Sequence, residues 1–396
     1  MTQAQLSGPV TTGRRAHLPA LDGLRGVAIA GVLLFHTGHL SGGFLGVDLF
    51  FALSGYLITD LLLREVDRTG TVSLTAFWAR RIRRLLPALA TMLAGVTVLV
   101  WFVGSPDQVR TTLTDGPWVQ ANLINWHLLA ESASYWDRFG SDRVFEHLWS
   151  IAVEEQFYLL WPLVILGMAH VSRRVDRRVA VVAASGAVAS LVLMIVLLSP
   201  ADPTRVYTGT DTRAFSLLLG ALVATRPVRT AMARVIGRRT GAVLAVGLGT
   251  AWVVVDGVSS PWLFTGGLFA HSLAAAMLIV LCTQAPDSLL AKSLGRRPVR
   301  GLGQISYSLY LWHWPVIVLL PDSITGWLRT VVVCAVSIGL ATLSKYLVED
   351  PIRFRVSWAR GRIGLVVLVA VLIGLASLWF LLPAPAPVTI DITGLK

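Results

Sequence analysis

The stretch LPALDGLRGVAIAGVLLFHTG, residues 18 to 38, is an apolar run long enough to span a bilayer, yet it carries Arg25 and His36. At ~100° per residue, their spacing places both side chains on one face of a helix, about 16 Å apart along its axis. An ionised side chain at membrane depth is costly unless it faces protein, water or a counter-charge. We therefore expect this face to line a polar interior. In the alternative interpretation, Arg25 snorkels to the cytosolic headgroups and His36 lies near the opposite headgroups.

The rest of the chain is similarly apolar. Of its 396 residues 55% are hydrophobic and 14% are charged, and the mean hydropathy is +0.68, values that are too apolar for a soluble domain. Apolar runs of about 20 residues recur and predict an all-α, polytopic bundle of about eleven transmembrane helices. The predicted spans are residues 19–38, 44–63, 85–103, 148–169, 179–198, 208–225, 240–256, 262–283, 302–320, 327–347 and 363–382.

The net charge of +12 could suggest a nucleic-acid partner, but its distribution argues against one. Most of the 34 Lys and Arg residues fall in alternate connecting segments, such as RRIRR at residues 80–84 and RRVDRR at residues 173–178. This positive-inside bias predicts a multi-pass membrane protein with a cytosolic N-terminus. We expect no nucleic-acid partner. Cys282 and Cys334 both fall within predicted spans and lack the spacing of metal ligands, so no metal site is expected.

The second span carries a carboxylate in GVDLFFALSGYLIT, residues 46–59. Asp48 lies a few residues inside the outer end, and the connection from the first span is short. Asp48 is therefore expected to meet His36, to orient one ring nitrogen and to favour the protonated imidazole. Alternatively, Asp48 interacts with the N–H groups at the start of its own helix.

Four arginines crowd the start of the third span in FWARRIRRLLPALA, residues 77–90. Arg80 and Arg84 share a helix face, which is expected to point at an anion such as the phosphates of a ligand or a lipid headgroup. A purely topogenic role would also explain the run.

Two adjacent carboxylates lie in EHLWSIAVEEQFYLLWP, residues 146–162, after His147. A membrane helix gains no stability from two glutamates, so at least one is expected to be functional. Adjacent helix positions diverge by ~100°, so only one of Glu154 and Glu155 is expected to face the same interior as His36. In SYSLYLWHWP, residues 306–315, His313 falls near mid-bilayer, where a lone histidine is as often a packed group as a catalytic one.

Together these motifs resemble the acyltransferase family 3 membrane proteins, integral-membrane O-acyltransferases that include O-antigen acetylases and macrolide acylases. The resemblance runs in the family's order from residue 18 to about residue 355. It rests on LDGLRGVAIAGVLLFH, GVDLFFALSGYLIT, RRIRRLLP, HLWSIAVEEQFYLLWP, DTRAFSLLLG, SYSLYLWHWP and VEDP.

The resemblance implies an acyltransferase of the bacterial cytoplasmic membrane. Its donor would be a cytosolic acyl-CoA, usually acetyl-CoA. Its acceptor would be a hydroxyl of a cell-envelope carbohydrate, a glycolipid or a macrolide-like secreted metabolite. The implied catalytic residues are His36, Glu154 and Asp48. The implied donor-binding residues are Arg25, Arg80, Arg81 and Arg84. The implied acceptor-binding residues are Arg213, His147 and His313. We expect Glu154 to act with His36, and His36 to be the general base toward the acceptor hydroxyl or, alternatively, the nucleophile that carries the acyl group.

The expected organisation is a cytosolic tail (residues 1–17), the acyltransferase domain with ten spans (18–355), an eleventh helix with its linker (356–382) and an extracytoplasmic Pro-rich tail (383–396). Many family members carry a hydrolase-like domain after the eleventh helix, and we expect this chain to lack it. The resemblance therefore leaves two alternatives open: a separate extracytoplasmic transferase as a partner, or a shortened version of a longer chain. The rival function is a transporter or flippase that uses Arg25, His36 and Glu154 as a relay, although no convincing internal repeat supports it.

Overall fold

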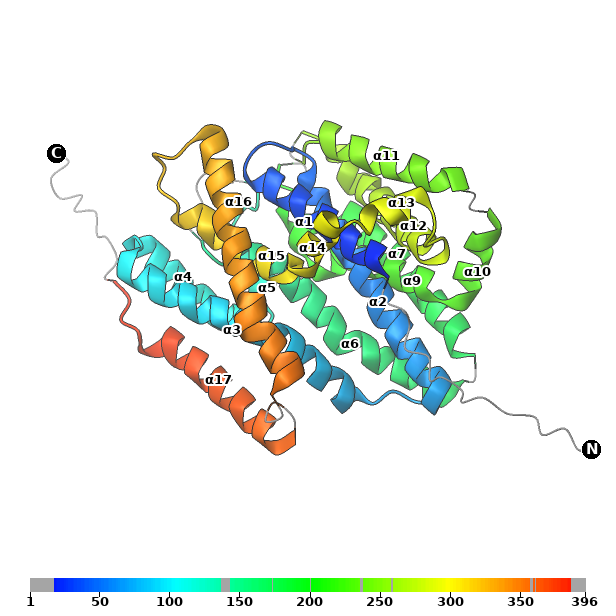
Figure 1. Ribbon diagram of the computed structural model, residues 1–396, viewed down its shortest axis with the longest axis horizontal. Coiled ribbons are helices and arrows are strands. Elements are labelled where there is room, and N and C mark those ends of the chain that lie inside the picture. Colours follow the sequence, from blue (N-terminus) through cyan, green and yellow to red (C-terminus); the bar gives the residue numbers. More distant parts are fainter. Residues whose placement is uncertain are drawn as a thin grey trace, which may run out of the picture.

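The computed structural model describes residues 18–385 except 137–142, 173, 200, 236–237, 258, 357–358 and 360. Throughout these residues the protein is built of helices and short helical turns, without strands (Figure 1). The all-α prediction is therefore confirmed. The two predicted tails, residues 1–17 and most of 383–396, lie outside the described residues.

Eight helical segments are long and apolar enough to cross a membrane. They contain α1 (Pro19–His36), α2 (Gly46–Thr69), α3 (Leu74–Val103), α6 (Trp149–Val171), α7 (Val175–Val196), α12 (Gly267–Gln284), α16 (Gly326–Leu343) with the turns η4 (Ser344–Glu349) and η5 (Pro351–Arg355), and α17 (Gly361–Leu381). Three of the eleven predicted spans form shorter helices, namely α9 (Thr210–Ala224), α11 (Arg238–Val254) and α15 (Ser306–Leu319). The protein is thus a multi-pass membrane protein.

The remaining helical elements are short. They are η1 (Gly43–Leu45), α4 (Pro106–Gln120), α5 (Ile124–Ala130), η2 (Glu146–Leu148), α8 (Thr204–Thr208), α10 (Arg226–Val235), η3 (Pro261–Thr265), α13 (Leu289–Leu294) and α14 (Arg297–Gln304).

Helix α3 begins earlier than its apolar run. The side chain of Ser73 caps it by accepting a hydrogen bond from the Ala76 amide, and Gly70, with a φ of 77°, ends α2 just before. At 30 residues, α3 is about 45 Å long, well over the ~30 Å of a hydrocarbon core. The arginine run therefore lies within a continuous helix, about two turns from its start.

Glycines bring α1 against α13 and α14 at backbone distance. A Cβ atom added at Gly26 would lie 2.2 Å from the Val299 carbonyl oxygen, and one at Gly303 would lie 1.7 Å from the Asp22 carbonyl oxygen. Only glycine tolerates such proximity. Because α15 follows α14 after one residue, this contact fixes α15 relative to α1 and thereby positions His313 beside His36.

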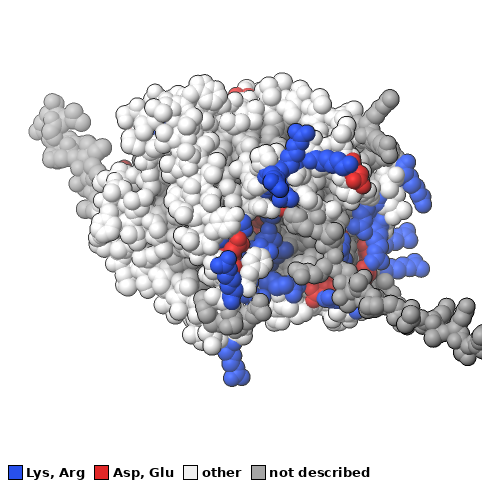
Figure 2. Space-filling view, viewed as in Figure 1, with Lys and Arg blue, Asp and Glu red and all other residues white. Residues whose placement is uncertain are grey.

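Basic side chains gather at one end of the bundle. In Figure 2 the visible Lys and Arg lie over α10, α13 and α14 and near the adjoining ends of α16 and α17, while the opposite half of this face is almost free of charge. His36 lies at the C-terminal end of α1, whereas Arg25 lies in its N-terminal half. The long polar segment that carries α4 and α5 lies at the other end of the bundle.

Helix α17 packs at the edge of the bundle beside α3 and α4 (Figure 1). The indole Nε1 of Trp379 donates to the side-chain oxygen of Gln120 (2.9 Å), and the Gln120 amide donates to the Leu372 carbonyl (2.9 Å). A groove lined mainly by leucines runs between α3, α6 and α17.

Candidate active site

A cavity in the bundle collects arginines, carboxylates and hydroxyl groups from five helices, namely α1, α2, α3, α6 and α15. Arg25 comes from α1, Arg81 and Arg84 from α3, and Glu154 and Glu155 from α6. We call it the arginine cavity. Its other polar lining residues are Ser54, Ser150, Tyr158, Ser306, Tyr307 and Tyr310. Three guanidinium groups around one space make a binding site for an anion with several charges.

The structure changes which arginines share a face. Arg81 and Arg84, three residues apart, line the cavity, and the Arg81 guanidinium lies 5.3 Å from the centre of the Tyr158 ring. Arg80 instead pairs with Glu65 on α2 at 3.3 Å, with 46% of its side chain exposed. The expectation that Arg80 and Arg84 point at the same anion is therefore wrong, because the helix turns Arg80 toward α2.

Glu154 lies in the arginine cavity and accepts hydrogen bonds from Ser54 of α2 and Tyr158 of α6. Glu155 borders the same cavity and also the groove beside α17. Both side chains thus border the arginine cavity, whereas His36 lines a different pocket. The expectation that only one glutamate faces the same interior as His36 therefore stays a prediction. The described contacts place Glu154 with the arginines, while those of His36 involve other groups.

His36 meets His313 at the opposite end of α1. Nδ1 of His36 lies 3.0 Å from Nε2 of His313, and Nδ1 of His313 lies 2.7 Å from the Tyr310 carbonyl oxygen. A carbonyl only accepts, so His313 carries its proton on Nδ1 and offers the lone pair of Nε2 to the Nδ1–H of His36. This chain assigns the tautomer of His36 that has its lone pair on Nε2.

A second, smaller pocket lies beside His36. We call it the histidine pocket, and Phe35, His36, Tyr135, Glu146, His147 and Trp314 line it. The Trp314 ring centre lies 4.9 Å from that of His36. The buried His147 donates from Nε2 to the Leu311 carbonyl (3.2 Å), and its Nδ1 finds no partner within the described part of the chain.

Tyr310 connects residues of the two pockets. Its hydroxyl donates to the His147 carbonyl (3.0 Å) and lies 2.6 Å from the Ser150 hydroxyl, and both Tyr310 and Ser150 line the arginine cavity. Its ring centre lies 5.6 Å from that of His147, which lines the histidine pocket. A residue of the arginine cavity therefore contacts a residue of the histidine pocket directly.

Asp48 is fully buried, but its described hydrogen bonds go to α9 and α12. Its Oδ1 accepts from Arg213 (2.9 Å), Ser216 (2.9 Å) and Ser272 (3.1 Å). Arg213 is equally buried and lies over the Tyr207 ring at 4.7 Å. The expected contact between Asp48 and His36 is corrected to a buried ion pair between α2 and α9.

Several groups at the site escaped the sequence analysis. Ser54 and Tyr158 hold Glu154, Ser150 and Tyr310 join the pockets, and Trp314 covers His36. Each stands within a motif that was already noted, such as SGYLIT or SYSLYLWHWP. A hydroxyl or indole inside an apolar span was the signal, yet such groups pack in many membrane helices.

Comparison with known proteins gives consistent matches. A family model described as an acyltransferase domain matches residues 18–348. The putative peptidoglycan O-acetyltransferase YrhL of Bacillus subtilis is 38% identical over 362 residues, which cover 86% of this chain and 56% of that protein. The peptidoglycan O-acetyltransferase OatA of Listeria monocytogenes is 34% identical over 352 residues, covering 86% and 56%.

The O-acetyltransferase OatA of Staphylococcus aureus is 36% identical over 350 residues, covering 85% of this chain and 57% of that protein. The chain thus spans about half the length of the curated relatives it matches. No solved structure matches it.

Proposed function

We propose that this chain, which belongs to the acyltransferase family, is a membrane-embedded O-acyltransferase. The domain model of that family matches residues 18–348. It would move an acetyl group from acetyl-CoA to a hydroxyl of a cell-envelope carbohydrate. The family match confirms the resemblance inferred from the motifs and favours transfer over the rival transporter function. The observation that carries the proposal is the arginine cavity, whose lining residue Tyr310 contacts His147 of the histidine pocket.

The arginine cavity suits the donor. Coenzyme A carries several phosphate charges, and Arg25, Arg81 and Arg84 can bind them with two parallel hydrogen bonds each. The pantetheine arm is long and thin, so it can carry the thioester toward Tyr310 while the phosphates stay among the arginines. The gathering of Lys and Arg at that end of the bundle supports a cytosolic entrance for the donor.

The histidine pocket suits the acceptor. The relatives are named as peptidoglycan O-acetyltransferases or O-acetyltransferases, which supports a sugar hydroxyl as the acceptor. Tyr135 and Trp314 offer aromatic surface on which the apolar face of a sugar ring can pack. His147 lines the same pocket and His313 contacts His36, which supports a role for both near the acceptor.

His36 acts as the general base. Its Nε2 lone pair takes the proton of the acceptor hydroxyl while the hydroxyl oxygen forms a bond to the thioester carbonyl carbon. The carbon–sulfur bond then breaks, and His36 passes this proton on to the coenzyme A thiolate. General base catalysis of this kind contributes about 10²- to 10⁴-fold in rate. His313 holds the imidazole in the required tautomer.

Glu154 acts within the donor cavity. Held by Ser54 and Tyr158, its carboxylate faces the same space as Arg25, Arg81 and Arg84. Its carboxylate balances part of the positive charge of the arginines and orients their guanidinium groups. The site can therefore bind the phosphates and still release them. As an ion pair, Asp48 and Arg213 join α2, which lines this cavity, to α9.

The test uses purified protein in nanodiscs with radiolabelled acetyl-CoA and a soluble peptidoglycan fragment. His36→Ala should reduce acetyl transfer at least 10²-fold while leaving donor binding unchanged, because the arginines lie about three helical turns away. His170→Ala, on an exposed histidine of α6, is the matched control. A fully active His36→Ala variant would refute the assignment. Stable label on His36 in the absence of acceptor would make His36 the nucleophile instead.

A further inference from the structure

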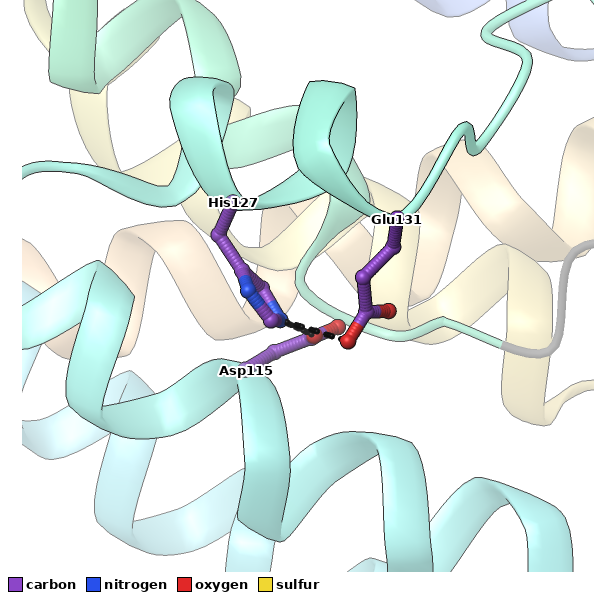
Figure 3. Close-up of side chains that lie close together, drawn as sticks. All are labelled: Asp115, His127 and Glu131. Carbon is purple, nitrogen blue, oxygen red and sulfur yellow. Dashed lines mark ion pairs between the residues drawn. The ribbon is translucent and has the colours of Figure 1, made fainter.

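Three potential metal ligands converge outside both pockets, where α4 faces α5 (Figure 3). Asp115 projects from α4, and His127 of α5 and Glu131, the residue directly after α5, point toward it. Nε2 of His127 lies 3.2 Å from Oδ1 of Asp115 and 3.4 Å from Oε1 of Glu131. One atom from each residue lies within 4.8 Å of the others.

The polar atoms at the centre of this cluster are buried and unsatisfied. The His127 side chain is 8% exposed and the Asp115 side chain 1% exposed. Within the described part of the chain, neither His127 Nε2 nor Asp115 Oδ2 has a hydrogen-bond partner, although two carboxylate oxygens lie near Nε2. Buried polar atoms are rarely left so, which indicates a ligand between them.

The spacing matches tetrahedral coordination. Zinc binds imidazole nitrogen and carboxylate oxygen at about 2.0–2.2 Å, which places neighbouring ligand atoms about 3.3–3.5 Å apart. The two distances from His127 Nε2, 3.2 and 3.4 Å, fall beside this value. The Trp118 ring stacks on His127 at 5.0 Å and 10°, and so fixes the direction of Nε2.

Arg143 contacts both carboxylates from the side. It lies 2.7 Å from Asp115 Oδ1 and donates to Glu131 Oε2. A carboxylate that ligates a metal keeps lone pairs for such a second partner, and ligating carboxylates are usually hydrogen-bonded in this way. The arginine is therefore compatible with an ion held between Asp115, His127 and Glu131.

The charges also leave room for a cation. Asp115 and Glu131 bring two carboxylates to this cluster, and Arg143 contacts both of them. One guanidinium balances one of the two negative charges that the ionised carboxylates carry, and a divalent cation would balance the other.

We propose that Asp115, His127 and Glu131 bind one Zn²⁺ ion, with a water in the fourth position and Arg143 orienting both carboxylates. An imidazole with two carboxylates suits zinc better than the all-oxygen sites of Ca²⁺ or Mg²⁺. The Arg143 carbonyl accepts a hydrogen bond from Trp314 Nε1 at 3.0 Å, and Trp314 lies on His36. The ion therefore steadies the segment beside the histidine pocket.

The experiment titrates Zn²⁺ into the full chain, purified in detergent without a polyhistidine tag and stripped of metal, in competition with a chromogenic chelator. We expect one Zn²⁺ per chain and a thermal unfolding temperature that rises with the Zn²⁺ concentration. Glu131→Gln, at a half-exposed position that should not disturb folding, and His127→Ala should each weaken binding by about 100-fold or more. His170→Ala should bind as the wild type does.

Absence of stoichiometric Zn²⁺ binding to the wild type would overturn the proposal. Zinc binding that survives in both His127→Ala and Glu131→Gln would overturn it too, because the ion would lie elsewhere. Preferential binding of Ca²⁺ over Zn²⁺ would refute the choice of metal. None of these outcomes depends on acyl transfer. The zinc proposal and the proposed enzymatic function can therefore be refuted independently.

Discussion

His36 can act as a base only in the tautomer that leaves its lone pair on Nε2, and a residue 277 positions further along the chain sets that tautomer. His313 does so because its own Nδ1 proton is committed to the Tyr310 carbonyl. The sequence placed His313 near mid-bilayer among aromatic residues but left open whether it was packed or catalytic. Helix periodicity fixes relative directions within one helix, and it cannot say which side chain of another helix lies opposite.

The same limit explains why the sequence analysis grouped Arg80 with Arg84, and the observed grouping of Arg81 with Arg84 leads to a prediction. Arg81→Gln and Arg84→Gln should each weaken acetyl-CoA binding by about 10- to 100-fold, because each removes a charged hydrogen bond to phosphate worth about 1.5–3 kcal/mol. Isothermal titration with purified protein measures the affinity. Arg80→Gln is the matched control, since Arg80 pairs with Glu65 on the surface. Equal losses in all three variants would show that the run acts only through net charge.

A stability prediction follows from the Asp48–Arg213 ion pair. Asp48→Asn should lower the free energy of unfolding by about 3–5 kcal/mol, because it leaves the fully buried Arg213 charge without its counter-charge. Denaturant titration in mixed micelles measures the loss. Asp211→Asn in the same region should cost no more than about 1 kcal/mol, since Asp211 pairs with Arg205 at a partly exposed site. A stable Asp48→Asn variant would contradict the ion-pair interpretation.

At the scale of helices, the apolar runs predicted most elements well, including the long α2, α3 and α6. The exceptions have physical reasons. The predicted span 302–320 is split into α14 and α15 because Gly303 packs against the α1 backbone, and α9 is short because it lies between α2 and α7 inside the bundle. Hydropathy responds to apolar composition, and it does not distinguish a helix covered by protein from one covered by lipid.

The contact between α1 and α14 can be tested with two glycines on the same helix. Gly303→Ala should destabilise the protein by about 1–3 kcal/mol or more and reduce transfer, because its Cβ would push α1, and with it His36, away from α15. Gly301→Ala is the control, since nothing lies within 4 Å of its added Cβ. It should leave stability unchanged or raise it by about 0.5–1 kcal/mol. Unfolding curves and acetyl transfer rates are compared for the two variants.

At the scale of the whole molecule, the two pockets define a direction across the membrane. If donor and acceptor meet from opposite sides, the arginine cavity must open toward the cytosol and the histidine pocket toward the outside. The uneven distribution of Lys and Arg is what the positive-inside rule leads one to expect for this orientation.

Cysteine labelling in intact cells tests this orientation. After replacement of Cys282 and Cys334 by Ala, Thr114→Cys on α4 should react with an impermeant maleimide added outside. Thr230→Cys on α10 should react only after the cells are opened. Both threonines are exposed, so accessibility to the reagent should depend only on the side of the membrane. The reverse pattern would invert the proposed entrances of donor and acceptor.

The close contact of α1 with α13 and α14 also has a consequence for biogenesis. Helix α1 leaves the ribosome first, yet the backbones that accommodate Gly23, Gly26 and Asp22 belong to residues near 294–303. At about 5–20 residues per second, roughly 14–55 s of synthesis separate the two. During that time α1 must wait in the membrane with Arg25 and His36 lacking their final neighbours. A chain released before residue 313 therefore lacks the His36–His313 pair, and we expect it to be inactive.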